Sequence, residues 1–123
     1  MIYGVGCDII EISRIEKAAS GQAFLMRCFT EKEIEYFKER NFKAESVAAG
    51  FAAKEAAAKA IKTGFSGFGF SDIEILHEEN GCPYVALRGK AKEFCDNNNI
   101  EISISMSHCK EYAMATAVAQ TKL

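Results

Sequence analysis

The sequence predicts an α+β fold, in which a mostly antiparallel sheet packs against one long helix and several shorter helices. Three observations indicate this class. Segment 44–62 is loaded with alanine, lysine and glutamate, all strong helix formers. Residues 100–106 alternate apolar and polar side chains, as a half-buried strand does. Asn80-Gly81 separates two strand-like runs and is a strong hairpin signal.

The first strand is predicted over residues 2–12, which are rich in Val, Ile and Tyr, and its two glycines are expected to weaken it. Ser13 followed three residues later by Glu16 forms a capping box, so a short helix is expected to begin there. Gly21 is expected to end or interrupt that helix.

A second capping box, Thr30 with Glu33, predicts a helix to about residue 40. Lysines in the last turn and Gly64 just beyond it mark the end of the long helix. The remaining elements are strands at 72–77 and 84–87, a short helix at 90–96 and a last strand at 112–119. This last strand is expected to pair with 100–106 as a hairpin around residues 108–110.

Composition bounds the class of protein. The chain has 123 residues, of which 49% are hydrophobic and 26% charged, which is typical of one globular domain spanning 1–123. A formal net charge of −2 does not suggest a nucleic-acid binder. No apolar run approaches the roughly 20 residues of a membrane span, and the N-terminus has no signal-peptide pattern. The five cysteines are widely spaced and form no CxxC motif, so free thiols in a reducing compartment, the cytoplasm, are expected.

The long helix carries the first candidate site. Glu55, Lys59 and Lys62 are spaced i, i+4 and i+7 and therefore share one helix face. Such a face is either solvated, with an i,i+4 ion pair, or an anion site with a carboxylate that holds a metal, and the spacing alone does not separate the two. Asp8 lies in an apolar strand, where it either points to the polar face or is paired or metal-bound.

The end of the 100–106 strand is the second candidate. Ser107 and His108 are donors that suit phosphate, although a polar hairpin turn explains them equally, and adjacent strand residues point to opposite faces. There is no Gly-x-Ser-x-Gly elbow of a hydrolase and no GxGxxG dinucleotide loop. His77 is interpreted as a residue of the strand surface and not as a ligand.

Four segments, in order, resemble the small bacterial holo-[acyl-carrier-protein] synthases, which are 4′-phosphopantetheinyl transferases. Their sequences are GVGCDIIEISRI at 4–15, FAAKEAAAKA at 51–60, NGCPY at 80–84 and SMSHCKEYA at 105–113. Each motif alone is weak to moderate, but the ordered set covers nearly the whole chain. The resemblance implies transfer of 4′-phosphopantetheine from coenzyme A to a serine of apo-acyl carrier protein in fatty acid biosynthesis, with release of adenosine 3′,5′-bisphosphate. It also implies a homotrimer with active sites between subunits.

The resemblance further assigns roles to residues. Asp8 and Glu55 would be catalytic and would hold Mg²⁺, with Mn²⁺ possible, and Glu55 would take the serine proton directly or through a metal-bound water. The coenzyme A contacts would be Lys59, Lys62, Thr63, Gly64, Pro83, Ser107 and His108. The carrier protein would dock on Arg14, Lys17 and Arg27.

The chain departs from the family pattern at Gly50, where many relatives have an arginine, so part of the expected contact to the 3′-phosphate of coenzyme A lacks its usual residue. Fewer arginines also lie between the first two helices. Two other functions stay open: a non-catalytic trimer that binds coenzyme A, and a transferase serving peptide or polyketide synthases, whose members are usually about twice this length.

Overall fold

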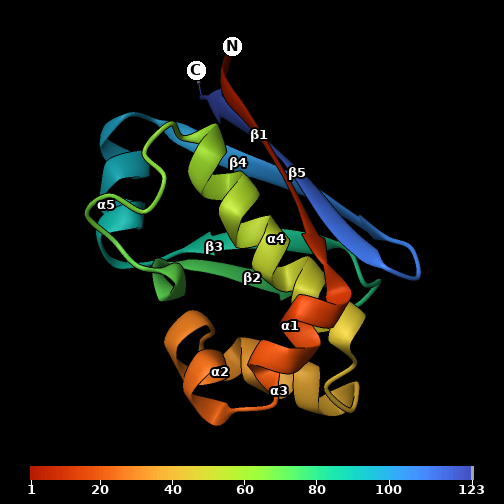
Figure 1. Cartoon of the computed structure of the whole chain (residues 1–123). Coiled ribbons are helices and arrows are strands. Elements are labelled where there is room, and N and C mark those ends of the chain that lie inside the picture. Colours follow the sequence, from red (N-terminus) through yellow and green to blue (C-terminus); the bar gives the residue numbers. More distant parts are fainter. Residues whose placement is uncertain (123) are drawn as a thin grey trace.

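The structure is a computed structural model and describes residues 1–122 (Figure 1). Strands and helices follow one another as β1 (Ile2–Glu11), α1 (Ile12–Ala19), α2 (Gln22–Cys28), α3 (Glu31–Glu39), α4 (Ala44–Ala60), the 3₁₀ turn η1 (Phe70–Asp72), β2 (Ile73–His77), β3 (Pro83–Leu87), α5 (Gly89–Asn97), β4 (Ile100–His108) and β5 (Tyr112–Thr121). The predicted α+β class is confirmed.

The strands form two antiparallel sheets. In the larger, β5 lies between β1 and β4, and the predicted β4–β5 hairpin is confirmed. β2 and β3 form the second sheet, joined by the turn at Asn80-Gly81. The two ends of the described chain lie side by side because Thr121 donates a backbone hydrogen bond to the Met1 carbonyl (Figure 1).

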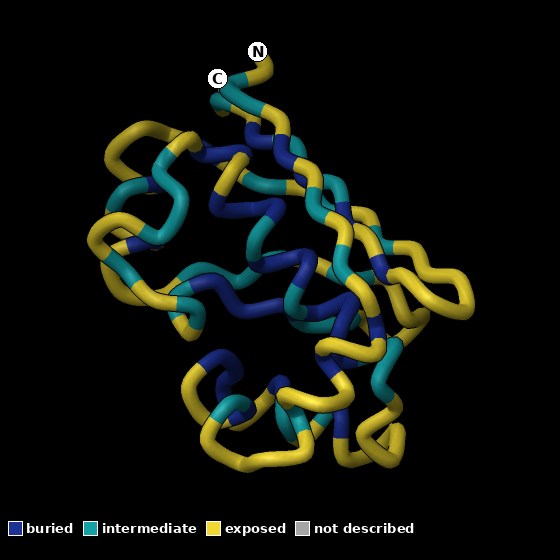
Figure 2. The backbone as a smooth tube through the Cα atoms, viewed as in Figure 1, coloured by how far each residue is buried: buried dark blue, intermediate teal, exposed yellow. Residues whose placement is uncertain are grey.

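Helix α4 occupies the centre of the molecule (Figure 2). Eleven of its 17 residues are buried, so it is enclosed on nearly all sides and has no broad solvated face. Its alanines let the surrounding strands approach closely. Over the last ten residues, 51–60, the positions that are not buried are Phe51, Glu55 and Lys59, which form one narrow stripe at i, i+4 and i+8.

The two glycines of β1 are required for its packing against α4. A methyl group at Gly4 would overlap the backbone oxygen of Ala60, and one at Gly6 would overlap that of Ala56. Only glycine allows two backbones to come this close. The glycines therefore do not weaken the strand: they bring β1 onto the helix, and they turn the next residue of the same face, Asp8, toward it.

The first capping-box prediction was wrong. Helix α1 begins at Ile12, one residue before Ser13, and its N-cap residue Glu11 makes no side-chain capping bond. Strand β1 passes directly into the helix, because the Ile12 amide donates to the carbonyl of Glu111 and the Ile12 side chain is buried. The second capping box is confirmed: Thr30 and Glu33 cap α3 reciprocally. Gly21 separates α1 from α2, as expected.

Candidate active site

Three residues that the sequence singled out meet where β1 crosses the last turns of α4. The Lys59 ammonium lies 3.2 Å from Asp8 Oδ1 and donates to the Cys7 carbonyl at 3.0 Å. Lys59 thus pairs across elements with Asp8, and the i,i+4 ion pair with Glu55 is not among the ion pairs of residues 1–122. The Lys59 side chain is 52% exposed and that of Asp8 19%, so both remain open to a ligand.

Glu55 completes this group. The pKa of its carboxyl is raised, first by partial burial and second by the negative charge of Asp8, while Lys59 acts in the opposite direction. Asp8 and Glu55 are therefore close enough to repel each other. A cation between them would relieve that repulsion.

This pair fits a magnesium ion. Mg²⁺ takes oxygen ligands and commonly uses only one or two protein carboxylates, with waters and substrate phosphates completing its shell. Within residues 1–122 no cluster of three or more His, Cys, Asp or Glu side chains is poised for a metal. A cation held by Asp8 and Glu55 would thus leave most of its coordination positions to water and substrate.

Lys62 does not continue the face of α4, contrary to the spacing argument. The helix ends at Ala60, and Lys62 has a left-handed backbone with φ 68°. Its ammonium lies 4.7 Å from the centre of the Tyr3 ring, above β1. Thr63 donates its hydroxyl to the Gly64 carbonyl, and Gly64 is also left-handed with φ 56°. These three residues form a loop beside β1 that begins just past Lys59.

A second group lines a separate pocket of about 390 Å³ between α3, the start of α4, the β2–β3 turn and the end of β4. Its lining includes Pro83, Ser107 and His108, which the resemblance assigned to coenzyme A, and also Gly50. Gly50 is closely covered, since a Cβ there would lie 3.2 Å from the Phe37 ring. An arginine at this position would require Phe37 to move.

The pocket also contains a residue that the sequence analysis set aside. His77 is half-buried, its ring lies parallel to that of Tyr36 at 3.8 Å, and its Nδ1 is buried without a hydrogen-bond partner. Burial and the charge of Arg40 lower the pKa of His77. A single histidine in a strand gave no signal of this environment, because the partners come from α3.

The two groups lie on different sides of the molecule. None of Asp8, Glu55 and Lys59 lines the pocket. β1 and β4 are the opposite edges of the larger sheet, with β5 between them. On α4, Glu55 and the pocket-lining Ser46 are nine residues apart, which places them about 180° apart around the helix. One chain therefore presents two separate groups of candidate residues.

The predicted docking residues lie on the first two helices. Arg14 and Lys17 are exposed on α1, and Arg27 is exposed on α2. Helix α1 follows directly from the strand that carries Asp8, so Arg14 lies in the first turn of that helix, six residues beyond Asp8 in the chain.

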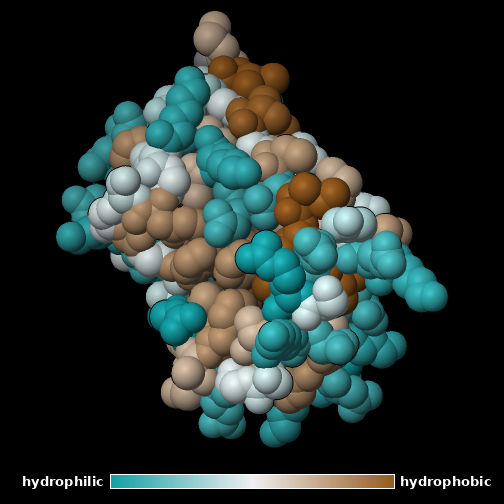
Figure 3. All heavy atoms as spheres, viewed as in Figure 1, coloured by the Kyte–Doolittle hydropathy of each residue, from teal (hydrophilic) through white to brown (hydrophobic). Residues whose placement is uncertain are grey.

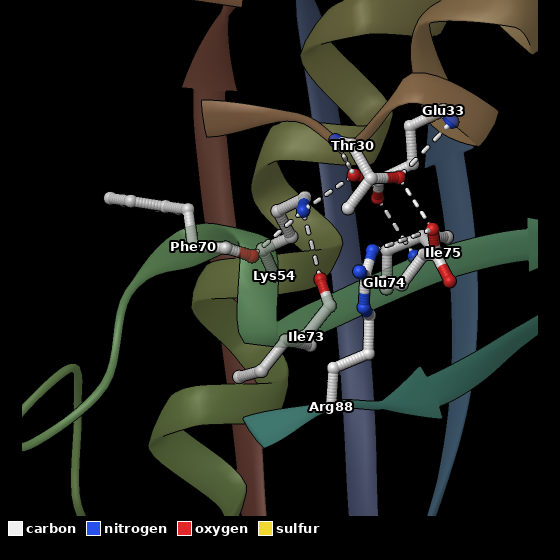
Figure 4. Close-up of polar contacts among 8 residues, drawn as sticks. All are labelled: Thr30, Glu33, Lys54, Phe70, Ile73, Glu74, Ile75 and Arg88. Atoms are coloured by element: carbon white, nitrogen blue, oxygen red, sulfur yellow. Dashed lines mark hydrogen bonds and ion pairs between the residues drawn. The ribbon is translucent and has the colours of Figure 1, made fainter. Parts of the chain in front are cut away.

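Beside Glu55, a buried ion-pair network fixes α4 in place (Figure 4). Lys54 is 0% exposed, and its ammonium lies 2.7 Å from Glu33 Oε1 and donates to the carbonyls of Phe70 and Ile73, both at 2.8 Å. Glu33 also accepts bonds from the amides of Thr30 and Ile75. Thr30 in turn donates to Glu74, which faces Arg88. This network was not predicted, because its contacts between elements join residues that lie 14 to 44 positions apart in the chain.

The comparisons with known proteins all indicate the same family. The sequence model of the 4′-phosphopantetheinyl transferase superfamily matches residues 4–117. The chain is 47% identical to a holo-[acyl-carrier-protein] synthase of Caldicellulosiruptor saccharolyticus over 121 residues, 98% of each chain. The crystal structure of the Neisseria meningitidis holo-[acyl-carrier-protein] synthase superimposes with a TM-score of 0.91 at 35% identity, covering 98% of this chain and 100% of that one.

A third relative was solved with a ligand. The holo-(acyl-carrier-protein) synthase of Bacillus anthracis, in complex with CoA (3′,5′-ADP), has a TM-score of 0.83 and 36% identity, with 99% of both chains covered. The fold and the sequence together place the chain among the 4′-phosphopantetheinyl transferases. Within that superfamily, it belongs to the holo-[acyl-carrier-protein] synthase family. No helix of residues 1–122 combines the length and the apolar character needed to cross a membrane.

Proposed function

We propose that this chain transfers the 4′-phosphopantetheine group of coenzyme A to a serine of apo-acyl carrier protein, and that it does so with Mg²⁺ as cofactor. The observation that carries the proposal is the meeting of Asp8, Glu55 and Lys59 at the crossing of β1 and α4. Two carboxylates suit a divalent cation, and a half-exposed ammonium beside them suits the diphosphate of coenzyme A.

The reaction exchanges the phosphoanhydride bond of the coenzyme A diphosphate for a phosphodiester bond to the serine. The serine oxygen attacks the phosphorus next to the pantetheine, and a new P–O bond forms. The bond from that phosphorus to the bridging oxygen breaks, and its electron pair leaves with adenosine 3′,5′-bisphosphate. Glu55 takes the serine proton. Lys59 contacts the diphosphate and offsets its charge.

Asp8 and Glu55 would hold the magnesium ion, with Mn²⁺ as a second suitable metal. When bound, the ion supplies Lewis-acid stabilisation of charge on the phosphate oxygens. The loop of Lys62, Thr63 and Gly64 borders the same region and offers an ammonium and backbone amides to the pantetheine phosphate.

We propose that the working enzyme is a homotrimer. The sheet face turned away from α4 exposes apolar side chains: Val5 is 61% exposed, Ile9 65% and Met114 37%. Hydrophobic atoms follow the position of β1 in the surface view (Figure 3). A contiguous apolar face of this kind suits contact with a second copy. Assembly would also bring one subunit's carboxylate pair to a neighbour's pocket, where Pro83, Ser107 and His108 would hold the nucleotide end of coenzyme A.

The carrier protein would dock on Arg14, Lys17 and Arg27. Acyl carrier proteins are acidic, so basic side chains next to the Asp8 strand would steer the serine toward the carboxylate pair.

We further propose that residues 1–123 act as one transferase domain in fatty acid biosynthesis. All five cysteines are free, which suits the reducing conditions of the cytoplasm.

Mass spectrometry tests the reaction. Apo-acyl carrier protein incubated with coenzyme A, Mg²⁺ and the enzyme should gain the mass of one phosphopantetheine group. No gain with Mg²⁺ or Mn²⁺ would contradict the proposed function and leave a coenzyme A-binding protein as the alternative.

Sedimentation velocity tests the assembly: the wild type should sediment as a trimer and Val5→Lys as a smaller species. A monomeric wild type would contradict the trimer alone.

A further inference from the structure

A stack of three side chains stands at the wall of the 390 Å³ pocket. The Tyr36 and His77 rings lie parallel with their centres 3.8 Å apart, and the guanidinium carbon of Arg40 lies 3.9 Å from the centre of the Tyr36 ring. Two groups this close to one ring centre cannot occupy the same face, so Tyr36 is sandwiched between Arg40 and His77. Tyr36 and His77 line the pocket, and Arg40 packs on the face of the Tyr36 ring that is turned away from His77.

The pocket lining contains no lysine and no arginine. Lys54 lies nearby but is fully buried and paired with Glu33, so it offers no charge to a ligand. Gly50 contributes no side chain. Glu45 also lines the pocket and repels anions, so a phosphate group is expected at the Tyr36 wall and away from Glu45. A phosphate with two negative charges needs a permanent cation there, and the stack provides one.

Arg40 is available for such a contact. It is exposed and takes part in none of the four ion pairs among residues 1–122. It caps the C-terminus of α3, and the left-handed residues Asn41 and Phe42, with φ 55° and 52°, turn the chain there toward α4. Stacking on Tyr36 fixes the plane of the guanidinium, whose N–H fork matches a phosphate group.

The stack carries one positive charge and not two. Burial lowers the pKa of His77, and the nearby Arg40 lowers it further, so the imidazole is neutral at neutral pH. A neutral imidazole and a phenol ring can support a guanidinium without charge repulsion.

We infer that Arg40, held over Tyr36, binds the 3′-phosphate of coenzyme A and determines the preference of this chain for coenzyme A over its dephosphorylated form. Arg40 thereby supplies from α3 the charge that Gly50 does not supply from α4. The inference rests on the proposed function, since it places the nucleotide end of coenzyme A in this pocket.

Calorimetric titration of the full chain with two nucleotides tests the inference without the metal. Adenosine 3′,5′-bisphosphate carries the 3′-phosphate, and 5′-AMP lacks it. The wild type should bind the bisphosphate about tenfold more tightly than 5′-AMP, as one charge-assisted phosphate contact predicts. Arg40→Gln should reduce this ratio to about one by weakening only the bisphosphate, and Arg40→Lys should keep part of it.

Lys43→Gln and Lys110→Gln are the matched controls. Each removes one exposed positive charge, and the two lysines lie two residues in sequence from the lining residues Glu45 and His108. Both variants should keep the tenfold ratio. The inference is overturned if Arg40→Gln keeps it, if a lysine variant loses it instead, or if the wild type has no preference.

A transfer assay separates this inference from the proposed function. The KM for coenzyme A should rise about tenfold in Arg40→Gln, while the KM for 3′-dephospho-coenzyme A should stay unchanged. If the wild type transfers phosphopantetheine but Arg40→Gln raises both KM values equally, only the role of Arg40 fails. If the wild type transfers nothing to apo-carrier protein, the proposed function fails whatever the nucleotide titrations give.

Discussion

Two neighbouring residues of α4, Lys54 and Glu55, belong to charged groups of opposite character. Lys54 is fully buried and satisfied by Glu33 and by two backbone carbonyls. Glu55 is half-buried, takes part in none of the four ion pairs among residues 1–122, and is repelled by Asp8. A buried charge persists only when it is fully paired, whereas an unsatisfied carboxylate pair persists where a ligand completes it. The first group should therefore maintain the fold, and the second should perform the chemistry.

Removing a carboxylate from the exposed pair should have the largest effect. Asp8→Asn and Glu55→Gln keep the side-chain shape and remove the charge that a cation needs. We expect each to lower kcat/KM for phosphopantetheine transfer more than about 10³-fold, the scale of losing one central electrostatic contact. The measurement is the rate of mass gain on apo-acyl carrier protein.

A control must show that both variants still fold. Their circular dichroism spectra should match that of the wild type, and their free energies of unfolding in urea should lie within about 1 kcal/mol of the wild-type value. Full activity in either variant would remove that residue from the proposed metal site, and unfolding would show that the pair also maintains the structure.

Breaking the buried group should reduce the stability of the fold. Lys54→Met leaves Glu33 buried and unpaired, so we expect a loss of about 3 kcal/mol in the free energy of unfolding, measured by urea denaturation. The double variant Lys54→Met with Glu33→Gln removes both charges and should recover part of that loss. If Lys54→Met were as stable as the wild type, the network would have no structural role.

Gly6→Ala should reduce both the stability of the fold and the rate of transfer. The added methyl group would overlap the Ala56 carbonyl, so β1 must move away from α4. We expect a loss of about 2 kcal/mol in stability, as for other overpacked interiors, together with a fall in transfer rate because Asp8 moves with the strand. The matched control is Gly69→Ala, since Gly69 has nothing within 4 Å of an added Cβ and should be neutral.

The sequence predicted one of these groups far better than the other. The helix, the strand and the spacing of Glu55 and Lys59 came from local patterns. Their meeting with Asp8 was expected only from the resemblance, because no local rule brings residue 8 to residue 55. The buried network was not predicted at all: Lys54 lies in a helix of good helix formers, where a solvated lysine is the default expectation. Its burial follows from the enclosure of α4 on nearly all sides, a tertiary property.

The stack of Arg40, Tyr36 and His77 was hidden for the same reason. It joins the end of α3 to the end of β2, and neither segment carries a motif. Lys62 shows the converse error, in which a regular spacing was extended beyond the helix end at Ala60. Two residues of irregular backbone were enough to move its ammonium from the face of α4 to the Tyr3 ring.

Lys59→Ala should produce an intermediate effect. The change removes the ammonium that pairs with Asp8 and that we assign to the diphosphate. We expect the KM for coenzyme A to rise about tenfold, which corresponds to about 1.4 kcal/mol. The matched control is Lys92→Ala, which breaks an exposed pair with Asp96 on α5. An unchanged KM in Lys59→Ala would remove its proposed phosphate contact.

The smallest expected effect is a change in stability, and its sign should distinguish the Asp8–Glu55 pair from the buried network of Lys54 and Glu33. Burial first, and Asp8 second, raise the pKa of Glu55 in the folded state, so the folded protein binds the Glu55 proton more tightly than the unfolded chain. This contribution to stability is complete below about pH 4.3, the ordinary pKa of glutamate, and is lost as the pH rises through the raised pKa. In metal-free buffer at pH 7, Glu55→Gln should therefore be more stable than the wild type by up to about 0.5 kcal/mol, after allowance for solvent screening. Burial also raises the pKa of Glu33 and lowers that of Lys54, but Glu33→Gln should be less stable than the wild type, since it leaves Lys54 buried and unpaired. Urea titrations from pH 4 to pH 8 measure both differences. A Glu55→Gln variant less stable than the wild type at pH 7 would show that Glu55, like Glu33, is held by favourable contacts.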